Sequence, residues 1–231
     1  PGAFSAVRAG EWCRAIGTPA STGTKLLSVS GDVARPGIYE FPFGVSVAEV
    51  LEAAGARETQ AVTSAGAAGH CLAADEFGRR IAFEDVATGG SIMVFDTSRD
   101  MFEVARNFAH FFAHESCGFC TPCRVGTSLL KGFMDKLANG HGAQADLADI
   151  DWLDLDEMAK MHRLMQGASH CGLGNTATIA LDDILVKFRP AFDRRLHSPE
   201  YEPAVDLDAA LSQARRMTGR DDAGAHLGDN R

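Results

Sequence analysis

Three cysteines, Cys117, Cys120 and Cys123, lie within seven residues and constrain the chain more than any other feature. Their C-x2-C-x2-C spacing lets one turn of chain direct three thiolates toward a common point. Gly118 allows the backbone to bend there, and Pro122 fixes φ and removes one hydrogen-bond donor. Three thiolates are one ligand short of a four-coordinate site. This cysteine triple therefore predicts a metal centre whose fourth ligand comes from elsewhere in the chain.

The fourth ligand is predicted to be Cys171, in segment 169–174. Apolar periodicity predicts four helices over 98–197, with the cysteine triple between the first and second helices and Cys171 between the third and fourth. In an up-down bundle these two connections lie at the same end, so that Cys171 can face the cysteine triple. His114 and His170 flank the two connections and are the alternative sources of the fourth ligand.

The grouping of the cysteines predicts which metal centre they hold. Structural zinc sites usually group their cysteines in two pairs. A three-plus-one grouping is typical of cubane iron–sulfur clusters, and in bacterial ferredoxins the nearby fourth cysteine of such a run serves another cluster. No such nearby cysteine follows Cys123, so the remote Cys171 would complete a single [4Fe-4S] cluster. Zinc, metal-free thiols and disulfides are the alternatives.

Four neighbours are predicted to surround this cluster. Arg124 places a positive charge beside a net-negative cluster, which favours the reduced form; the alternative is a solvated arginine at a helix start. The backbone N–H groups of Gly118, Gly172 and Gly174 are expected to donate hydrogen bonds to sulfur, with an effect in the same direction. Because all four thiolates are occupied, no iron is open to substrate. The site is therefore predicted to relay electrons, and no catalytic residue is predicted.

The chain before the cluster segment has β texture and predicts a small domain of the β-grasp kind. Strands over 26–30 and 38–41 are expected to form a hairpin, and Ser46 is expected to cap a helix that ends at Gly55. Further strands are expected over 60–63, 80–83 and 91–95. The predicted fold class is α+β, with this domain followed by a four-helix bundle that carries the iron–sulfur cluster.

Apolar stripes place the four bundle helices around 101–112, 125–137, 153–165 and 179–188. Asn139-Gly140 is expected to stop the second helix, Gly167 to break the third, and Asn175 or Thr176 to cap the fourth, with Pro190 near its end. The expected domains are a lead-in helix (4–16) and linker over 1–24, the β-grasp domain over 25–97, the bundle over 98–197, and a partly disordered tail over 198–231 with one helix at 206–217.

Composition and charge argue against a nucleic-acid-binding protein and against a membrane-inserted one. The 231 residues carry a net charge of -9 without a long basic run, so a nucleic-acid partner is not expected. No apolar run approaches the ~20 residues that span a bilayer, and no signal peptide is visible, so direct membrane insertion is not expected. Clustered cysteines without an export signal indicate metal ligands in a reducing, cytoplasmic setting. Cys13 and Cys71 are isolated and are predicted to be bystander thiols.

The motifs ESCGFCTPCRVGT (115–127) and SHCGLGNTAT (169–178) are similar to the C-terminal part of the flavin- and NADH-binding subunit of respiratory complex I. Its relatives include the diaphorase flavin subunit of NAD-reducing [NiFe]-hydrogenases and NAD-linked formate dehydrogenases. Segment 27–40 resembles the start of the family's SLBB domain, a β-grasp module, and Glu11-Trp12 and Gly17-Thr18 resemble the segment that leads into it. The similarity covers about residues 1–197.

The resemblance implies that the cysteine triple and Cys171 match the family's cluster ligands. In the family, NADH delivers two electrons as hydride to FMN, and the cluster takes them from the reduced flavin one at a time. FMN and NADH bind a Rossmann-like domain that precedes the SLBB domain. This sequence, which begins with Pro1, has neither room for that domain nor a G-x-G-x-x-G motif. The chain is therefore expected to be a C-terminal fragment or a separate subunit, inactive alone, with the flavin site on another polypeptide.

Cys171-Gly172-Leu173-Gly174 and segment 202–211 look more like the hydrogenase diaphorase subunit than like complex I subunits, which often have a proline after the remote cysteine. The resemblance thus implies a flavin-domain polypeptide, other iron–sulfur subunits and hydrogenase subunits as partners. Complex I and NAD-dependent formate dehydrogenase are the alternatives within the family. A different class of function is a non-enzymatic interaction module, in which the β-grasp domain binds a partner and zinc only clips the bundle.

Overall fold

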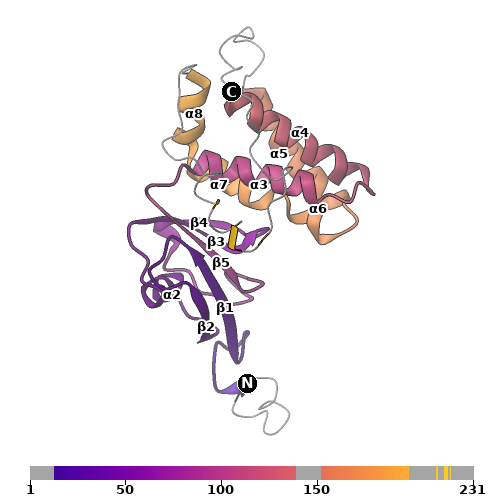
Figure 1. Cartoon of the computed structure of the whole chain (residues 1–231). Helices are drawn as coiled ribbons and strands as arrows, with labels where there is room; N and C mark the ends of the chain where they lie inside the picture. Colours follow the sequence, from indigo (N-terminus) through magenta and orange to yellow (C-terminus); the bar gives the residue numbers. More distant parts are fainter. Residues whose placement is uncertain (1–12, 139–151, 198–211, 213–215, 218, 220–231) are drawn as a thin grey trace. The chain divides into compact units, whose positions relative to one another are not determined.

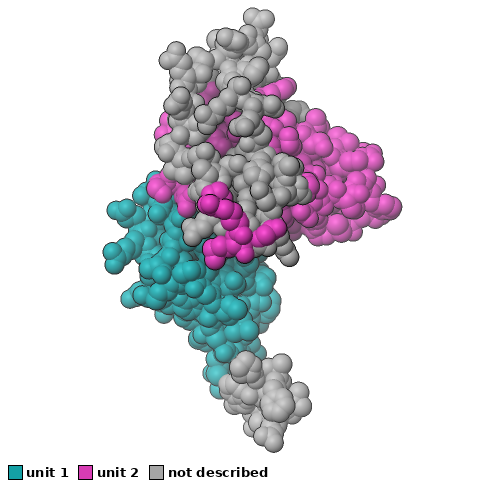
Figure 2. All heavy atoms as spheres, in the orientation of Figure 1, with its two compact units in different colours: residues 1–97 teal, residues 98–231 magenta. Residues whose placement is uncertain are grey.

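The computed structural model describes residues 13–138, 152–197, 212, 216, 217 and 219 (Figure 1). The chain divides into two compact units, unit 1 over 1–97 and unit 2 over 98–231, which Figure 2 shows in separate colours. Most of the predicted lead-in helix over 4–16, the stop at Asn139-Gly140 and most of the predicted tail helix over 206–217 lie outside the described residues. No helix among the described residues is long and apolar enough to cross a membrane.

Unit 1 contains a five-stranded mixed sheet with the strand order β2-β1-β5-β3-β4. β1 pairs antiparallel with β2 and parallel with β5, while β3 pairs antiparallel with β4 and β5. The hairpin, the helix that follows it and the parallel β1–β5 pair make up the predicted α+β arrangement. The elements are β1 (Thr24–Gly31), β2 (Gly37–Pro42), α2 (Val47–Ala54), β3 (Thr59–Ala67), β4 (Cys71–Ala73), η1 (Ala74–Glu76) and β5 (Ser91–Asp96).

The core of unit 1 lies between the sheet and α2, which lies beside the strands in Figure 1. Period-2 alternation turns Leu27 and Val29 of β1 into this core, whereas Leu26 is 54% exposed. The predicted caps of α2 are confirmed. Ser46 and Glu49 form a reciprocal capping box, and Gly55 ends the helix in the left-handed conformation with φ 69°.

The strand predicted over 80–83 is wrong. The Asp85 carboxylate accepts hydrogen bonds from the Arg80 N–H at 2.8 Å and from the Arg79 guanidinium at 2.9 Å, and these bonds fold the segment into a turn. The backbone of Arg80 forms only an isolated antiparallel β-bridge with Ser46. The sheet instead gains β4, which has three residues, too few for an alternating pattern to be visible in the sequence.

Unit 2 is helical, and α3, α4, α5 and α7 fall on the four predicted apolar stripes. α3 packs against α4 and α7, and α4 packs against α5. Two further helices, α6 and α8, precede and follow α7 in the chain. The elements are α3 (Met101–Glu115), α4 (Thr121–Ala138), α5 (Trp152–Ala168), α6 (Gly172–Thr176), α7 (Ile179–Lys187) and α8 (Arg189–His197).

Two predicted helix boundaries in unit 2 are wrong. Gly167 does not break α5, which continues to Ala168. Asn175 and Thr176 belong to α6, and Thr178 is the residue that precedes α7. α7 ends at Lys187, shortly before Pro190, as predicted. Pro190 also lies in the first turn of a further helix, α8, where its missing N–H would have had no intrahelical partner.

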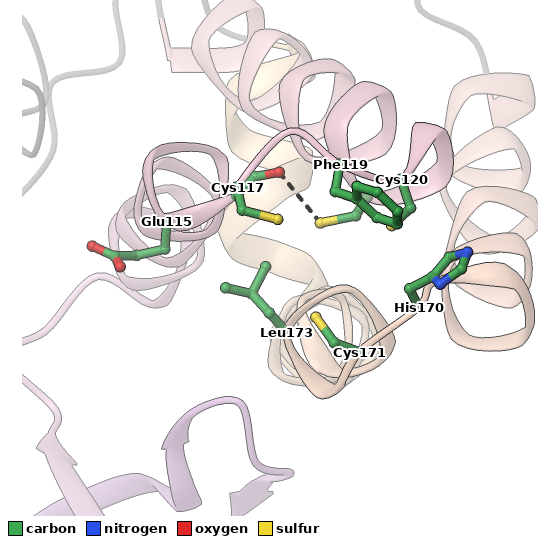
Figure 3. A pocket seen from close by; sticks show the side chains of 9 residues that line it. Glu115, Cys117, Phe119, Cys120, His170, Cys171 and Leu173 are labelled. Atoms are coloured by element: carbon green, nitrogen blue, oxygen red, sulfur yellow. Dashed lines mark hydrogen bonds between the residues drawn. The ribbon is translucent and has the colours of Figure 1, made fainter.

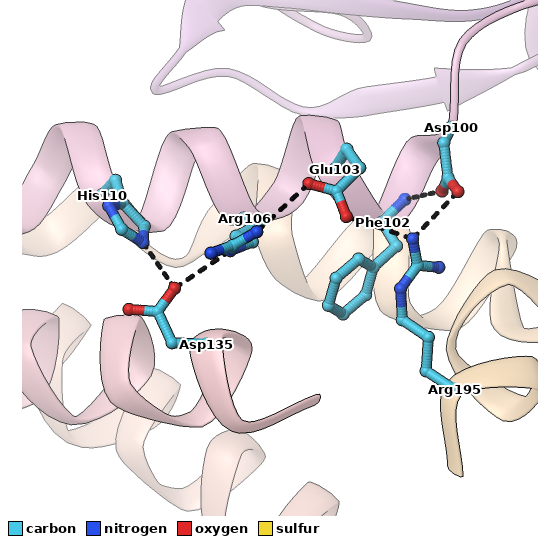
Figure 4. Close-up of polar contacts among 7 residues, drawn as sticks. All are labelled: Asp100, Phe102, Glu103, Arg106, His110, Asp135 and Arg195. Carbon is cyan, nitrogen blue, oxygen red and sulfur yellow. Dashed lines mark hydrogen bonds and ion pairs between the residues drawn. The ribbon is translucent and has the colours of Figure 1, made fainter. Parts of the chain in front are cut away.

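Charged side chains form a buried network between α3, α4 and α8 (Figure 4). At the start of α3, the Arg195 guanidinium of α8 lies 2.9 Å from the Asp100 carboxylate and 3.1 Å from that of Glu103. The same guanidinium lies 3.7 Å from the centre of the Phe102 ring. The network therefore ties α8 to the first turn of α3 by charge and by packing.

Asp135 of α4 is the second centre of this network. Its carboxylate lies 2.7 Å from His110 Nε2, 2.9 Å from Arg106 Nε and 3.1 Å from Lys131 Nζ. Burial raises the pKa of Asp135, but the hydrogen bonds from His110, Arg106 and Lys131 outweigh burial and hold the pKa well below its ordinary value. The carboxylate is therefore charged at neutral pH and joins α3 to α4.

Candidate metal centre

The connection between α3 and α4 carries the cysteine triple. Cys117 follows the last residues of α3, Cys120 directly precedes α4, and Cys123 lies in the first turn of α4. Gly118 has φ +76°, a left-handed conformation that favours glycine. Its carbonyl accepts a hydrogen bond from the Arg124 guanidinium at 3.2 Å, which closes the loop on the helix start.

Cys171 lies where α5 gives way to α6. It occupies the N-cap position of α6, and its carbonyl accepts the Asn175 N–H at 3.2 Å. α5 and α6 both pack against α4. The approach of α5 is close at Gly126, where an added Cβ would overlap Met165 Sδ. A glycine in α4, three residues after Cys123, thus lets the end of α5 come close to the cysteine triple.

All four predicted ligands line one pocket of about 260 Å³. In Figure 3 the side chains of Cys117 and Cys171 point toward the space between the loop and α6. The rings of Phe119 and His170, one from each connection, meet edge to face with centroids 5.3 Å apart. The full lining is Glu115, Ser116, Cys117, Phe119, Cys120, Cys123, His170, Cys171 and Leu173.

The four thiols differ in exposure. Cys123 is only 4% exposed, Cys120 is half-buried, and Cys117 and Cys171 are exposed. The backbone N–H of His170 lowers the pKa of the Cys120 thiol, and the N–H of Cys123 adds to this effect. Both donors favour the thiolate, the form that binds metals. Because His170 and Cys123 belong to different connections, both sides of the pocket stabilise the charge on Cys120.

The four residues predicted to surround the cluster, Gly118, Arg124, Gly172 and Gly174, differ in their hydrogen-bond partners and in their exposure. The Gly118 N–H donates to Ser116 Oγ at 3.4 Å, and Arg124 donates to the Gly118 carbonyl. Gly172 is exposed, with open space where a side chain would lie, whereas Gly174 is buried. Sequence reasoning missed Ser116, whose hydroxyl lies 3.4 Å from Cys123 Sγ. In the sequence, the only indication that Ser116 belongs to the site is its position next to Cys117.

Gly174→Ala is expected to weaken metal retention although it leaves all four thiols in place. A Cβ at this position would overlap Ser169 Oγ and lie 2.9 Å from Cys123 Cβ, so the wall of the pocket must shift. We expect a severalfold loss of bound metal after gel filtration, measured by elemental analysis. Gly172→Ala is the matched control, because an added Cβ there meets nothing within 4 Å. Equal metal content in the two variants would contradict this account of the pocket.

Comparison with known families matches two regions of the chain. Residues 26–65 match the SLBB domain, and residues 103–195 match the family described as the NADH-ubiquinone oxidoreductase-F iron–sulfur binding region. The second region contains the cysteine triple and Cys171. The two matches define the class of protein: an SLBB domain followed by an iron–sulfur binding helical region.

Curated relatives match across most of the chain. The alpha subunit of the NAD-reducing hydrogenase HoxS of Cupriavidus necator is 39% identical over 204 residues, which are 87% of this chain and 33% of the relative. An NADH-quinone oxidoreductase subunit of Rhizobium meliloti is 32% identical over 197 residues, 80% of this chain and 45% of the relative. A solved structure of an NAD+-reducing [NiFe]-hydrogenase in the air-oxidized state is 40% identical, with a TM-score of 0.76, over 94% of this chain and 38% of the other.

The chain therefore belongs to the NADH-ubiquinone oxidoreductase-F family, of which it contains the SLBB domain and the iron–sulfur binding region. The family resemblance predicted from the cysteine motifs is confirmed. The chain spans 33% and 45% of the lengths of these two curated relatives.

Proposed function

We propose that Cys117, Cys120, Cys123 and Cys171 hold a [4Fe-4S] cluster through which the chain transfers single electrons inside an NAD(H)-linked oxidoreductase. The observation that carries the proposal is the position of all four thiols around one pocket of about 260 Å³. A cubane cluster is held by four cysteine thiolates. The three-plus-one arrangement around a common space meets that requirement.

Zinc fits the same side chains less well. A zinc ion draws its ligands close together, because each sulfur must lie about 2.3 Å from the metal. Among the residues that the structure describes, no three histidine, cysteine or acidic side chains are grouped closely enough to hold one metal ion. The three-plus-one grouping of the cysteines around this pocket, in place of the two pairs usual in structural zinc sites, favours a cluster over a single ion.

The protein's own residues hold and shield the cluster. When bound, the cluster supplies one-electron oxidation and reduction. Cys123 would hold the cluster from a buried position, whereas Cys117 and Cys171 would hold it from exposed positions, which a redox partner can approach. With the four thiolates engaged, no position stays open for substrate, which suits an electron relay.

The electron donor and the final acceptor in this proposal lie outside the chain. The matched relatives are by name an NAD-reducing hydrogenase and an NADH-quinone oxidoreductase, and each is more than twice as long as the part matched here. We infer that FMN and NAD(H) bind a polypeptide region beyond these 231 residues. In such a complex the cluster held by this chain would take single electrons from a reduced flavin and supply them to other iron–sulfur subunits. The chain alone is expected not to oxidise NADH.

An NAD-reducing hydrogenase is the setting we favour. The HoxS alpha subunit is 39% identical to this chain, compared with 32% for the Rhizobium meliloti NADH-quinone oxidoreductase subunit. Complex I and an NAD-dependent formate dehydrogenase are the alternatives. Co-purification of hydrogenase subunits with the native protein would support the first, and co-purification of quinone-reductase or formate dehydrogenase subunits would support one of the others.

Metal analysis tests the cluster directly. Purified without oxygen, the 231-residue chain is expected to be brown, to contain about four irons and no stoichiometric zinc, and to give an electron paramagnetic resonance signal after reduction with dithionite. A colourless protein with one zinc per chain would overturn the proposal and would support the zinc-clipped interaction module. Chelation of the metal is expected to destabilise unit 2, because the site joins two connections that are distant in sequence.

A further inference from the structure

A serine hydroxyl contacts the most buried of the four cysteine sulfurs. Ser116 Oγ lies 3.4 Å from Cys123 Sγ, a contact marked by the dashed line in Figure 3. This separation suits a hydrogen bond to sulfur, whose radius exceeds that of oxygen. Ser116 is the C-cap residue of α3, and its own N–H donates to the Phe112 carbonyl at 3.1 Å. The backbone of Ser116 is therefore held by α3, and its hydroxyl is directed toward α4.

The direction of this hydrogen bond follows from the partners of Ser116. The Gly118 N–H donates to Ser116 Oγ at 3.4 Å, so the serine oxygen already acts as an acceptor. A Cys123 sulfur that binds iron is a thiolate and has no proton to give. The hydroxyl proton of Ser116 is then the only proton between the two atoms, and Ser116 must be the donor. A donor that itself accepts a hydrogen bond is polarised and donates more strongly.

A second hydroxyl, from Ser169, lies in the neighbourhood of Cys123. Ser169 Oγ is buried and has no hydrogen-bond partner among the described residues. It borders Gly174, at the point where an added Cβ would also meet Cys123 Cβ. A buried hydroxyl without a partner is costly. Ser169 does not itself line the pocket, so the acceptor assigned to it is the sulfur of its neighbour Cys123, and not the interior of the pocket. Ser116 comes from the end of α3 and Ser169 from the end of α5.

We propose that Ser116, and with it Ser169, donate hydrogen bonds to sulfur atoms on the Cys123 side of the cluster and thereby raise its reduction potential. Reduction adds one electron and increases the negative charge on sulfur, so a hydrogen-bond donor stabilises the reduced form more than the oxidised form. The effect is strong at Cys123, because its surroundings exclude water and a low dielectric strengthens the bond. The inference rests on the proposed cluster and adds two residues that set its potential.

The test is a redox titration of the full chain, with dithionite as the one-electron donor and electron paramagnetic resonance as the readout. Ser116→Ala is expected to lower the reduction equilibrium constant about tenfold, which corresponds to a shift of about 59 mV to lower potential. Ser169→Ala is expected to shift the potential in the same direction. Ser116→Thr keeps the hydroxyl and is expected to retain the wild-type potential.

Ser128→Ala is the matched control, because Ser128 Oγ donates to the Arg124 carbonyl at 2.9 Å on the exposed side of α4 and reaches no sulfur. Iron content and the shape of the reduced signal are measured for every variant, so that loss of the cluster is separated from a change in potential. A wild-type chain without iron would contradict the proposed function itself. A wild-type cluster whose potential is unchanged in both alanine variants would overturn this inference while the proposed function stands.

Discussion

Cys171→Ala is expected to lose at least one of the cluster's four irons and with it the electron paramagnetic resonance signal of the reduced [4Fe-4S] form. Cys171 is the only thiol that the α5–α6 connection contributes to the pocket, and the other three come from the α3–α4 loop and the first turn of α4. Without it, one side of the site has no sulfur ligand. Iron content per chain and the signal after dithionite reduction measure the loss.

Cys13→Ala is the matched control for this prediction, because Cys13 belongs to unit 1 and is not among the residues that line the pocket. It is expected to retain the full iron content of the wild type. A Cys171→Ala protein with a complete cluster would mean that another side chain supplies the fourth ligand. His170 lines the same pocket, so Cys171→Ala combined with His170→Ala would then identify it.

The parts of this structure that could be predicted depend on local signals or on topology. Ser46, Gly55 and the apolar stripe between them define α2, because caps and periodicity act within one helix. The meeting of Cys171 with the cysteine triple followed from a topological rule for alternating helices, since no local signal connects segments so far apart. The structure places both around one pocket.

The parts that could not be predicted depend on tertiary contacts. Segment 80–83 is apolar enough for a strand, but the Arg80 backbone N–H donates a hydrogen bond to the Asp85 carboxylate, and the segment forms a turn. The contact of Ser116 with Cys123 requires the exact path of the loop, which the spacing of the cysteines does not determine. Arg195 reads as one of several surface charges in a basic helix, yet it is buried against carboxylates about ninety residues earlier in the chain.

Arg195→Met is expected to lower the free energy of unfolding by about 3–5 kcal/mol, because it leaves the carboxylates of Asp100 and Glu103 buried without their shared partner. The side chains of Arg195 and Asp100 are each only 2% exposed, so water cannot replace the lost charge. Methionine preserves most of the volume beside Phe102, which separates the loss of charge from the loss of packing. The corresponding fall in the thermal midpoint is about 10 °C, measured by circular dichroism.

Arg194→Met is the matched control, since Arg194 is the exposed neighbour on the same helix and its loss is expected to change stability by less than about 1 kcal/mol. A combined variant, Arg195→Met with Asp100→Asn and Glu103→Gln, is expected to recover part of the lost stability, because the buried groups are then neutral. Asn at position 100 can still accept the Phe102 N–H, so the cap of α3 is retained. No recovery in this variant would mean that Arg195 acts through packing alone.

The pH dependence of the Arg195→Met defect is a further signature of buried charge. Burial raises the pKa of Glu103, while the charges of Arg106 and Arg195 lower it, so removal of Arg195 raises this pKa further. A carboxyl whose pKa is higher in the folded than in the unfolded protein stabilises the folded state while it is protonated. This contribution is complete below the unfolded pKa of about 4.3, and it is lost as the pH rises through the folded pKa. The difference in stability between wild type and variant is therefore expected to be smallest near pH 4 and to grow toward neutral pH. A difference that is constant across this range would show that lost packing, and not the loss of the guanidinium charge beside Asp100 and Glu103, destabilises the variant.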